Sequence, residues 1–331
     1  MASATPGWIR TCGIAIAALA ALLPREGHAG HYEYFATEHA EVRPAAHQGG
    51  LLLLGGGDWP DEAMPWFAEH AGRGHIVMIG ASGDAEDHAE LAAALGEVAS
   101  LETLVLHDRA SSSDPRVLAI LARADGIFIH GGDQANYVRF WKDTPIADLI
   151  ERRFREGCPI GGTSAGLAIL GEWAYGSMDG GSLTSAEGLH DPLGPGVTLV
   201  GDFLHLAPLK GVITDSHFAP RGRLGRLMVF VARLAAEGHP VTGLGIDEEA
   251  GVLVGSDGVG RVVSRNGGGA TIVPPPATAV VAAGREFAAR GFVLTRITAG
   301  GSLALSPLRA LSQATTTVVD VRRGAAPPVW P

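Results

Sequence analysis

A serine at a predicted sharp turn is the strongest chemical signal in the sequence. Gly162-Thr163-Ser164-Ala165-Gly166 matches the pattern G-x-S-x-G, after a predicted strand over Pro159–Gly162 and before a predicted helix over Ala165–Gly171. Such a turn presents the serine hydroxyl at the carboxyl edge of a sheet, because small neighbours let the chain reverse sharply. The amide N–H of Ala165, at the helix start, can then face a developing oxyanion. We predict that Ser164 is a nucleophile; the alternative is an ordinary glycine turn.

A serine nucleophile needs a base, and the base needs an orienting group. Asp215-Ser216-His217 follows a predicted strand over Gly211–Thr214, and Asp247-Glu248 follows another over Thr242–Ile246. If both strands are parallel members of the sheet, their ends converge with Ser164 where ligands bind in such folds. We predict His217 as the base and Glu248 as its orienting acid, with Asp247 as the open alternative for the acid. The order serine, histidine, acid argues against an α/β-hydrolase, in which the acid precedes the histidine.

Three arginines lie within a span of six residues shortly after the predicted base. They are Arg221, Arg223 and Arg226, in a protein with 35 acidic and 25 basic residues and a net charge of −10. Guanidinium groups bind carboxylates through paired hydrogen bonds. We predict a local site for an anionic substrate group; ion pairs on a solvated helix face are the alternative.

The positioning elements are predicted from alternating apolar strands and helical segments. The predicted strands are Leu51–Leu54, His75–Ile79, Leu101–Leu106, Gly126–His130, Pro159–Gly162, Gly211–Thr214 and Thr242–Ile246. The predicted helices are Pro60–Ala71, Ala85–Val98, Asp114–Ala122, Asn136–Trp141, Pro145–Glu156, Ala165–Gly171 and Leu224–Ala236. This alternation predicts an α/β fold with a mainly parallel, doubly wound sheet flanked by helices. An ordered loop or hairpin is expected over 174–195, and short strands and turns over 250–315.

Composition excludes several classes of protein. The chain has 331 residues, of which 46% are hydrophobic and 18% charged, so it is not a disordered segment. Its negative charge disfavours nucleic acid and anionic membranes as partners. No H-E-x-x-H, Cys-x-x-Cys or Walker motif occurs, and Gly55-Gly56-Gly57-Asp58 does not continue as G-x-G-x-x-G. We expect no metal and no cofactor.

Residues 1–29 have the pattern of a secretory signal peptide. Arg10 precedes the apolar stretch Gly13–Leu23, and Gly27-His28-Ala29 supplies small residues at a cleavage site. We therefore expect an exported protein, periplasmic or extracellular, with no stable membrane insertion after cleavage. Only Cys158 would remain of the two cysteines, so we expect no intramolecular disulfide.

Four motifs together resemble the cyanophycinases, which group with aspartyl dipeptidases among serine peptidases with a class I glutamine amidotransferase-like fold. The resemblance covers about residues 50 to 260, in the family's order. Its motifs are Gly131-Gly132-Asp133-Gln134, Gly162–Gly166, Asp215-Ser216-His217-Phe218 with the three arginines, and Gly245-Ile246-Asp247-Glu248.

The resemblance implies a function and a set of site residues. Ser164 would be the nucleophile, His217 the base and Glu248 the acid of the triad. The substrate pocket would be lined by Gln134, Asp215, Arg221, Arg223 and Arg226. The family hydrolyses β-aspartyl-arginine units of cyanophycin, or small peptides with an N-terminal aspartate, and its members are commonly homodimers. The expected domains are a peptidase domain over 48–265 and a β-rich C-terminal extension over 266–331, packed on the same domain.

Two positions depart from the family pattern. Ser216 stands where the family usually has glutamine, and Leu167 where alanine is common. Because a longer amide is missing from the expected pocket wall, strict cyanophycin specificity does not follow. We expect acyl transfer to water, with the N–H groups of Ala165 and Gly132 holding the oxyanion. The alternatives are an amidase of different specificity and a catalytically silent binding protein on the same scaffold.

Overall fold

The computed structural model describes residues 30–325, so the predicted signal peptide lies outside the described residues. Within them, 16 strands form one sheet. One end of the sheet has five parallel strands side by side. In spatial order they are β4 (Ser100–Leu106), β3 (His75–Gly80), β5 (Gly126–Ile129), β6 (Ile160–Thr163) and β2 (Leu51–Leu54).

A second parallel group carries the other predicted site segments. Here β10 (Thr242–Ile246) runs parallel to β9 (Val212–Asp215), which runs parallel to β7 (Trp173–Tyr175). The strand β8 (Leu199–Gly201) is antiparallel to β7. Antiparallel strands join the two groups: β11 (Ala250–Val254), β12 (Val259–Ser264), β15 (Ala288–Leu305) and β13 (Gly269–Val273).

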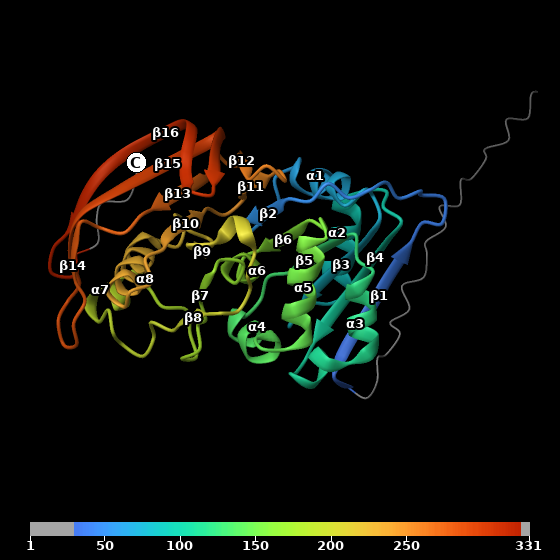
Figure 1. Ribbon diagram of the computed structural model, residues 1–331, viewed down its shortest axis with the longest axis horizontal. Coiled ribbons are helices and arrows are strands. Elements are labelled where there is room, and N and C mark those ends of the chain that lie inside the picture. The colour runs from blue at the N-terminus through green and yellow to red at the C-terminus, as the bar shows by residue number, and fades with distance from the viewer. Residues whose placement is uncertain (1–29, 326–331) are drawn as a thin grey trace, which may run out of the picture.

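Helices cover both faces of the first parallel group (Figure 1). The helices α1 (Ala63–His70) and α2 (Ala85–Leu95) pack against Leu52 and Leu54. On the other face, Leu51 and Leu53 belong to the core formed with α3 (Pro115–Ala122), α4 (Gln134–Trp141), α5 (Pro145–Arg155) and α6 (Ala165–Ala168). Because successive strand side chains point to opposite faces, a strand buried on both sides is apolar throughout. The four leucines of β2 therefore identify a central strand.

The segment 174–195 contains more regular structure than the sequence predicts. It includes most of β7 and the helix α7 (Ser185–His190), which begins with a capping box between Thr184 and Glu187. The long helix α8 (Leu224–Ala236) has the predicted bounds and shares a third core with α7. In contrast, α6 ends at Ala168, three residues before the predicted end.

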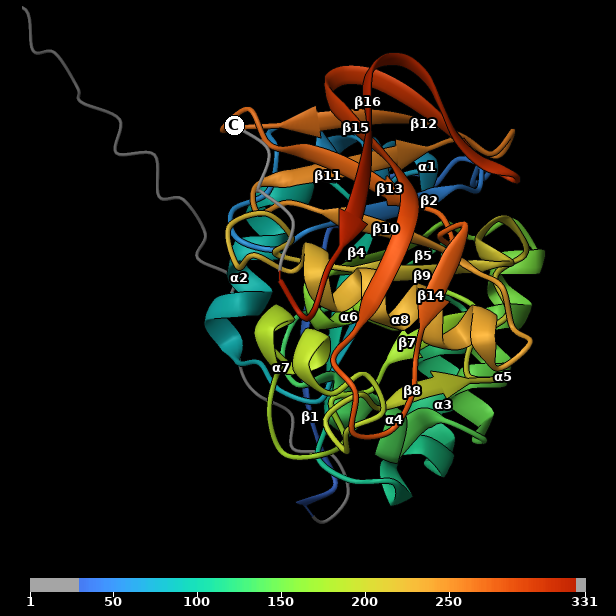
Figure 2. The same cartoon turned by 90° about the vertical axis from the view of Figure 1, so that its left-hand side faces the viewer.

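The C-terminal part differs from the expected short strands and turns. It contains the long strands β15 and β16 (Leu308–Val321), with β14 (Thr278–Val280) paired to β15. These strands form a curved ribbon in front of the rest of the molecule in Figure 2, at the opposite end from β1 (Tyr32–Glu38) in Figure 1. Because β13 pairs with β10 on one side and β15 on the other, the C-terminal strands continue the same sheet.

None of the helices between residues 30 and 325 is both long and apolar enough to cross a bilayer. Short 3₁₀ turns occur at Ala110–Ser113 and Ala207–Leu209. Cys158 is buried just before β6 and unpaired.

Candidate active site

Ser164 lies at a strained turn between β6 and α6. Its backbone has φ 53° and ψ −115°, a positive-φ conformation that costs free energy in residues other than glycine. The two glycines of the motif allow the close packing that holds it there. A Cβ on Gly162 would lie 2.8 Å from the carbonyl carbon of Gly166, and one on Gly166 would overlap the carbonyl oxygen of Ile129. The structure therefore contains the predicted sharp turn at Ser164.

The three predicted catalytic side chains meet in one hydrogen-bonded chain. The distance from Ser164 Oγ to His217 Nε2 is 2.7 Å, and that from His217 Nδ1 to Glu248 Oε1 is also 2.7 Å. The His217 residue is 8% exposed. Three distant segments, which follow β6, β9 and β10, thus place a hydroxyl, an imidazole and a carboxylate in the order that general-base activation of a serine requires.

The surroundings favour a neutral imidazole beside an ionised carboxylate. Burial lowers the pKa of His217 below its ordinary value; the hydrogen bond to Glu248 opposes this effect, and the charges of Arg221 and Arg223 add to it. Partial burial acts to raise the pKa of Glu248. Hydrogen bonds and charges from His217 and Arg221 outweigh that effect, so the pKa of Glu248 lies below its ordinary value. Neutral His217 can accept the serine proton.

The geometry distinguishes between the two candidate acids. Asp247 is 3% exposed, and its hydrogen-bond partners among the described residues do not include His217. It accepts hydrogen bonds from the amides of Ala219 at 3.0 Å and Gly269 at 2.9 Å, and it pairs with Arg296. Its carboxylate therefore links neighbouring segments, while Glu248 contacts the imidazole.

A glycine loop after β2 contacts His217, a role that the sequence analysis missed. The carbonyl oxygen of Gly55 accepts a hydrogen bond from the His217 amide at 2.7 Å. Gly56 has φ 100°, and a Cβ on it would overlap the His217 ring. The three consecutive glycines at this strand end are the signal in the sequence from which this contact could have been predicted.

A cavity of about 300 Å³ opens beside Ser164. Its walls include the two predicted oxyanion donors, Gly132 and Ala165, and three of the predicted substrate-binding residues, Gln134, Arg221 and Arg223. Among the described residues, the amides of Gly132 and Ala165 donate no backbone hydrogen bond, which leaves them free to bind an oxyanion.

Two predicted pocket residues, Asp215 and Arg226, do not line this cavity, and that expectation is corrected. They form a buried ion pair, with Asp215 2% and Arg226 1% exposed. Arg226 donates from Nε to Oδ2 at 2.8 Å and from Nη2 to Oδ1 at 2.5 Å. A buried carboxylate at a strand end requires such a partner, because an unpaired buried charge is costly. The Asp215–Arg226 pair therefore lies buried outside the cavity lining.

The other two arginines have different environments. Arg223 is 8% exposed and donates to the carbonyl oxygen of Ser216 at 2.7 Å, while its Nη1 lies 3.6 Å from Asp215. Arg221 is more exposed, and its Nε lies 3.2 Å from Glu248 Oε1. Sequence reasoning also missed Arg139, a cavity-lining residue on α4 that belongs to none of the motifs.

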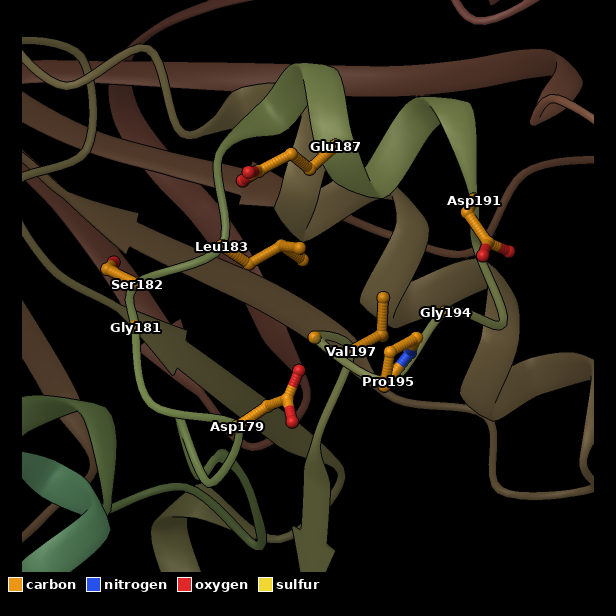
Figure 3. Close-up of a pocket in the computed structure, with 10 residues that line it drawn as sticks. Asp179, Gly181, Ser182, Leu183, Glu187, Asp191, Gly194, Pro195 and Val197 are labelled. Carbon is orange, nitrogen blue, oxygen red and sulfur yellow. The ribbon is translucent and has the colours of Figure 1, made fainter.

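A neighbouring cavity of similar size shares Gly181 and Ser182 with the first. Figure 3 shows acidic side chains around it, from Asp179, Glu187 and Asp191. Within residues 30–325, no group of three or more His, Cys, Asp or Glu side chains is arranged to hold a metal ion.

Comparisons with known proteins agree with the predicted family. Residues 51–259 match the model of "Peptidase family S51". The cyanophycinases of Synechococcus elongatus and Thermosynechococcus vestitus are each 36% identical over 170 residues, covering 51% of this chain and 48% of theirs. The cyanophycinase of Trichormus variabilis is 34% identical over 160 residues, or 48% of each chain. The chain thus spans about half the length of the curated relatives it matches.

A solved structure shows the same fold at low sequence identity. A crystal structure of a peptidase from an acI-B1 Actinobacterium has a TM-score of 0.52 and 16% identity, covering 78% of this chain and 98% of that one. The fold class and the family predicted from the motifs are confirmed. The chain belongs to peptidase family S51.

Proposed function

We propose that this protein is an exported exopeptidase that hydrolyses β-aspartyl peptide bonds through a Ser164-His217-Glu248 triad and an acyl-enzyme. The observation that carries the proposal is the continuous hydrogen-bonded chain, with 2.7 Å from serine to imidazole and 2.7 Å from imidazole to carboxylate. The neutral state favoured for His217 supports its role as the base.

The proposed reaction has two acyl-transfer steps. Ser164 Oγ attacks the amide carbonyl carbon while His217 Nε2 takes the hydroxyl proton, and the N–H groups of Ala165 and Gly132 bind the resulting oxyanion. The tetrahedral intermediate collapses as the C–N bond breaks and the imidazolium gives its proton to the leaving amine. Water then attacks the ester, His217 takes its proton, and Ser164 leaves with that proton restored.

The cavity supports a substrate with a free carboxylate. A β-aspartyl linkage uses the side-chain carboxyl group of aspartate, so the α-carboxylate beside the scissile bond stays free. Arg223 and Arg221 on the cavity wall can bind such a group, and Gln134 adds an amide. The curated relatives named above are cyanophycinases, and the family resemblance implies activity on β-aspartyl-arginine units. Ser216 also lines the cavity and gives it a shorter side chain than glutamine would.

Hydrolysis of matched dipeptides tests the proposed function. We expect β-Asp-Arg to be cleaved faster than α-Asp-Arg and γ-Glu-Arg, and Ser164→Ala to lower the rate by at least about 10³-fold. Unchanged circular dichroism would establish that this variant folds. Retained cleavage by folded Ser164→Ala, or a preference for γ-glutamyl peptides, would contradict the proposal.

Export is proposed from residues 1–29 alone. Fusion of these residues to a reporter that is active only outside the cytoplasm tests it, with Arg10→Glu as a variant that reverses the charge before the apolar stretch. We expect reporter activity from the fusion and less from the variant. An inactive fusion would contradict export.

A further inference from the structure

A buried tyrosine on α4 contacts the backbone that carries one of the two proposed oxyanion donors. Tyr137 is 0% exposed, and its Oη lies 2.6 Å from the carbonyl oxygen of Gly131 and 2.8 Å from that of His130. We propose that Tyr137 is a positioning residue, whose hydroxyl fixes the orientation of the Gly131–Gly132 peptide group and so aims its N–H at the oxyanion. This inference rests on the proposed function of Ser164 as the nucleophile, but not on the proposed substrate.

The carbonyl of Gly131 and the N–H of Gly132 belong to one planar peptide group. This peptide group is trans, so its carbonyl and its N–H point in opposite directions, and a hydrogen bond that holds one of them also directs the other. Tyr137 holds the carbonyl oxygen, while Gly132 lines the cavity beside Ser164. A Cβ on Gly131 would lie 3.8 Å from Ser164 Oγ, which places this peptide group next to the nucleophile.

Two consecutive glycines make this peptide group easy to rotate. Rotation of a peptide plane changes mainly ψ of the residue before it and φ of the residue after it, and glycine restricts neither strongly. Gly132 already has φ 138°. A rotated peptide group would turn the Gly131 carbonyl oxygen toward the developing negative charge. The Ala165 N–H has no such freedom because it belongs to the first turn of α6. A constraint from outside the loop is therefore needed at Gly131–Gly132, and the Tyr137 hydroxyl supplies one.

Tyr137 is itself held firmly. Its ring stacks on that of Trp141, with ring centroids 4.4 Å apart and planes 13° from parallel. Burial raises the pKa of Tyr137 above its ordinary value, so the hydroxyl keeps the proton that it donates to the loop. The loop is also closely packed, since a Cβ on Gly132 would overlap Ser82 Oγ and lie 3.3 Å from Tyr137 Oη.

Covalent labelling of Tyr137→Phe, which keeps the ring and removes the hydroxyl, tests the inference. The probe is a fluorophosphonate, because negative charge develops on its phosphoryl oxygen as Ser164 attacks and no peptide substrate is needed. We expect the rate constant for labelling to fall about 10-fold or more. The midpoint of its pH dependence should not move, because His217 keeps its surroundings.

Tyr32→Phe is the matched control. Tyr32 is also buried, at 3% exposed, and its hydroxyl has no hydrogen-bond partner within the described residues. This variant should keep the native labelling rate and pH midpoint, and urea unfolding establishes that both variants fold. A folded Tyr137→Phe that is labelled at the native rate would overturn the inference. A shifted pH midpoint would also overturn it, because the effect would then act through His217.

A crystal structure of the native protein with the phosphonyl adduct on Ser164 needs no variant. We expect the phosphoryl oxygen within hydrogen-bond distance of the Gly132 amide, with the Gly131 carbonyl still on Tyr137. A Gly131 carbonyl turned toward the adduct would overturn the inference. If the native protein is labelled but does not cleave β-Asp-Arg, only the proposed substrate fails. If Ser164 is not labelled, the proposed nucleophile fails and this inference fails with it.

Discussion

His217 is enclosed between a hydroxyl and a carboxylate, and this environment determines the pH range in which it can act as a base. The pKa of His217 is lowered chiefly by burial, so the folded protein holds the imidazole neutral at a pH where a free histidine is partly protonated. Because protonated His217 cannot accept the Ser164 proton, the proposed mechanism requires activity to rise with pH as the imidazole loses its proton.

We expect kcat/KM to increase with pH through an apparent pKa below 6.5, the ordinary value for histidine. A pH profile of β-Asp-Arg hydrolysis measures it. The charge of Arg221 lowers the same pKa, so Arg221→Gln should move the acidic limb toward higher pH. A midpoint above pH 7 in the native enzyme would contradict this view of His217.

The meeting of the three proposed catalytic residues could be predicted from the sequence more fully than the lining of the cavity. Ser164, His217 and Glu248 each directly follow or closely follow an apolar strand, so the fold class itself predicts their meeting. Whether an arginine faces substrate or a buried partner depends on side-chain packing, which spacing does not reveal. Arg226 was therefore placed wrongly, and Arg139 was missed because no motif surrounds it.

At the scale of elements, the loop after β2 holds the proposed base, His217, in place. Gly55 accepts a hydrogen bond from the His217 amide, and Gly56 lies against the ring. A side chain at Gly56 would push the imidazole away from Ser164. We therefore expect this loop to affect the proposed catalysis through the position of His217.

We predict that Gly56→Ala lowers kcat at least about 10-fold with a smaller effect on KM, because a shift of the base disrupts proton transfer. Gly96→Ala is the matched control. Gly96 also has positive φ, at 70°, but a Cβ there would meet nothing within 4 Å. Both variants place alanine at a positive φ and so share the cost in backbone free energy. Equal activities in the two would therefore contradict this role of the loop.

The parallel elements were predictable because burial on both faces gives continuous apolar runs. The C-terminal strands lack that signal. Most of β16 is exposed, and Gly291, Gly300 and Gly301 interrupt the apolar pattern within β15. Their pairing depends on contacts between residues that are distant in sequence, so the order of apolar and polar residues indicated only short strands. The helix α7 was missed because its glycine and polar residues resemble a loop.

At the scale of the whole molecule, an ion pair connects the C-terminal ribbon to the candidate active site. Arg296 on β15 pairs with Asp247, whose carboxylate also binds the amides of Ala219 and Gly269. Asp247 directly precedes Glu248, and Ala219 is two residues from His217. The ribbon thus helps to keep Glu248 and His217 in their relative positions.

We predict that Arg296→Met destabilises the fold by about 3–5 kcal/mol, the usual cost of leaving one member of a buried ion pair unpaired. It should also lower kcat in the fraction that stays folded. Urea unfolding and single-turnover rates measure the two effects. Arg309→Met, an exposed change on β16, should alter neither. A stable, fully active Arg296→Met would show that the site does not depend on the ribbon.

The most direct test of the catalytic chain is covalent labelling of the nucleophile. A fluorophosphonate reacts with a serine hydroxyl only when an adjacent base activates it. Peptide mapping by mass spectrometry should find one adduct, on Ser164, and a much slower adduct in His217→Ala. An unlabelled Ser164 in the folded native protein, or labelling that does not depend on His217, would contradict the account.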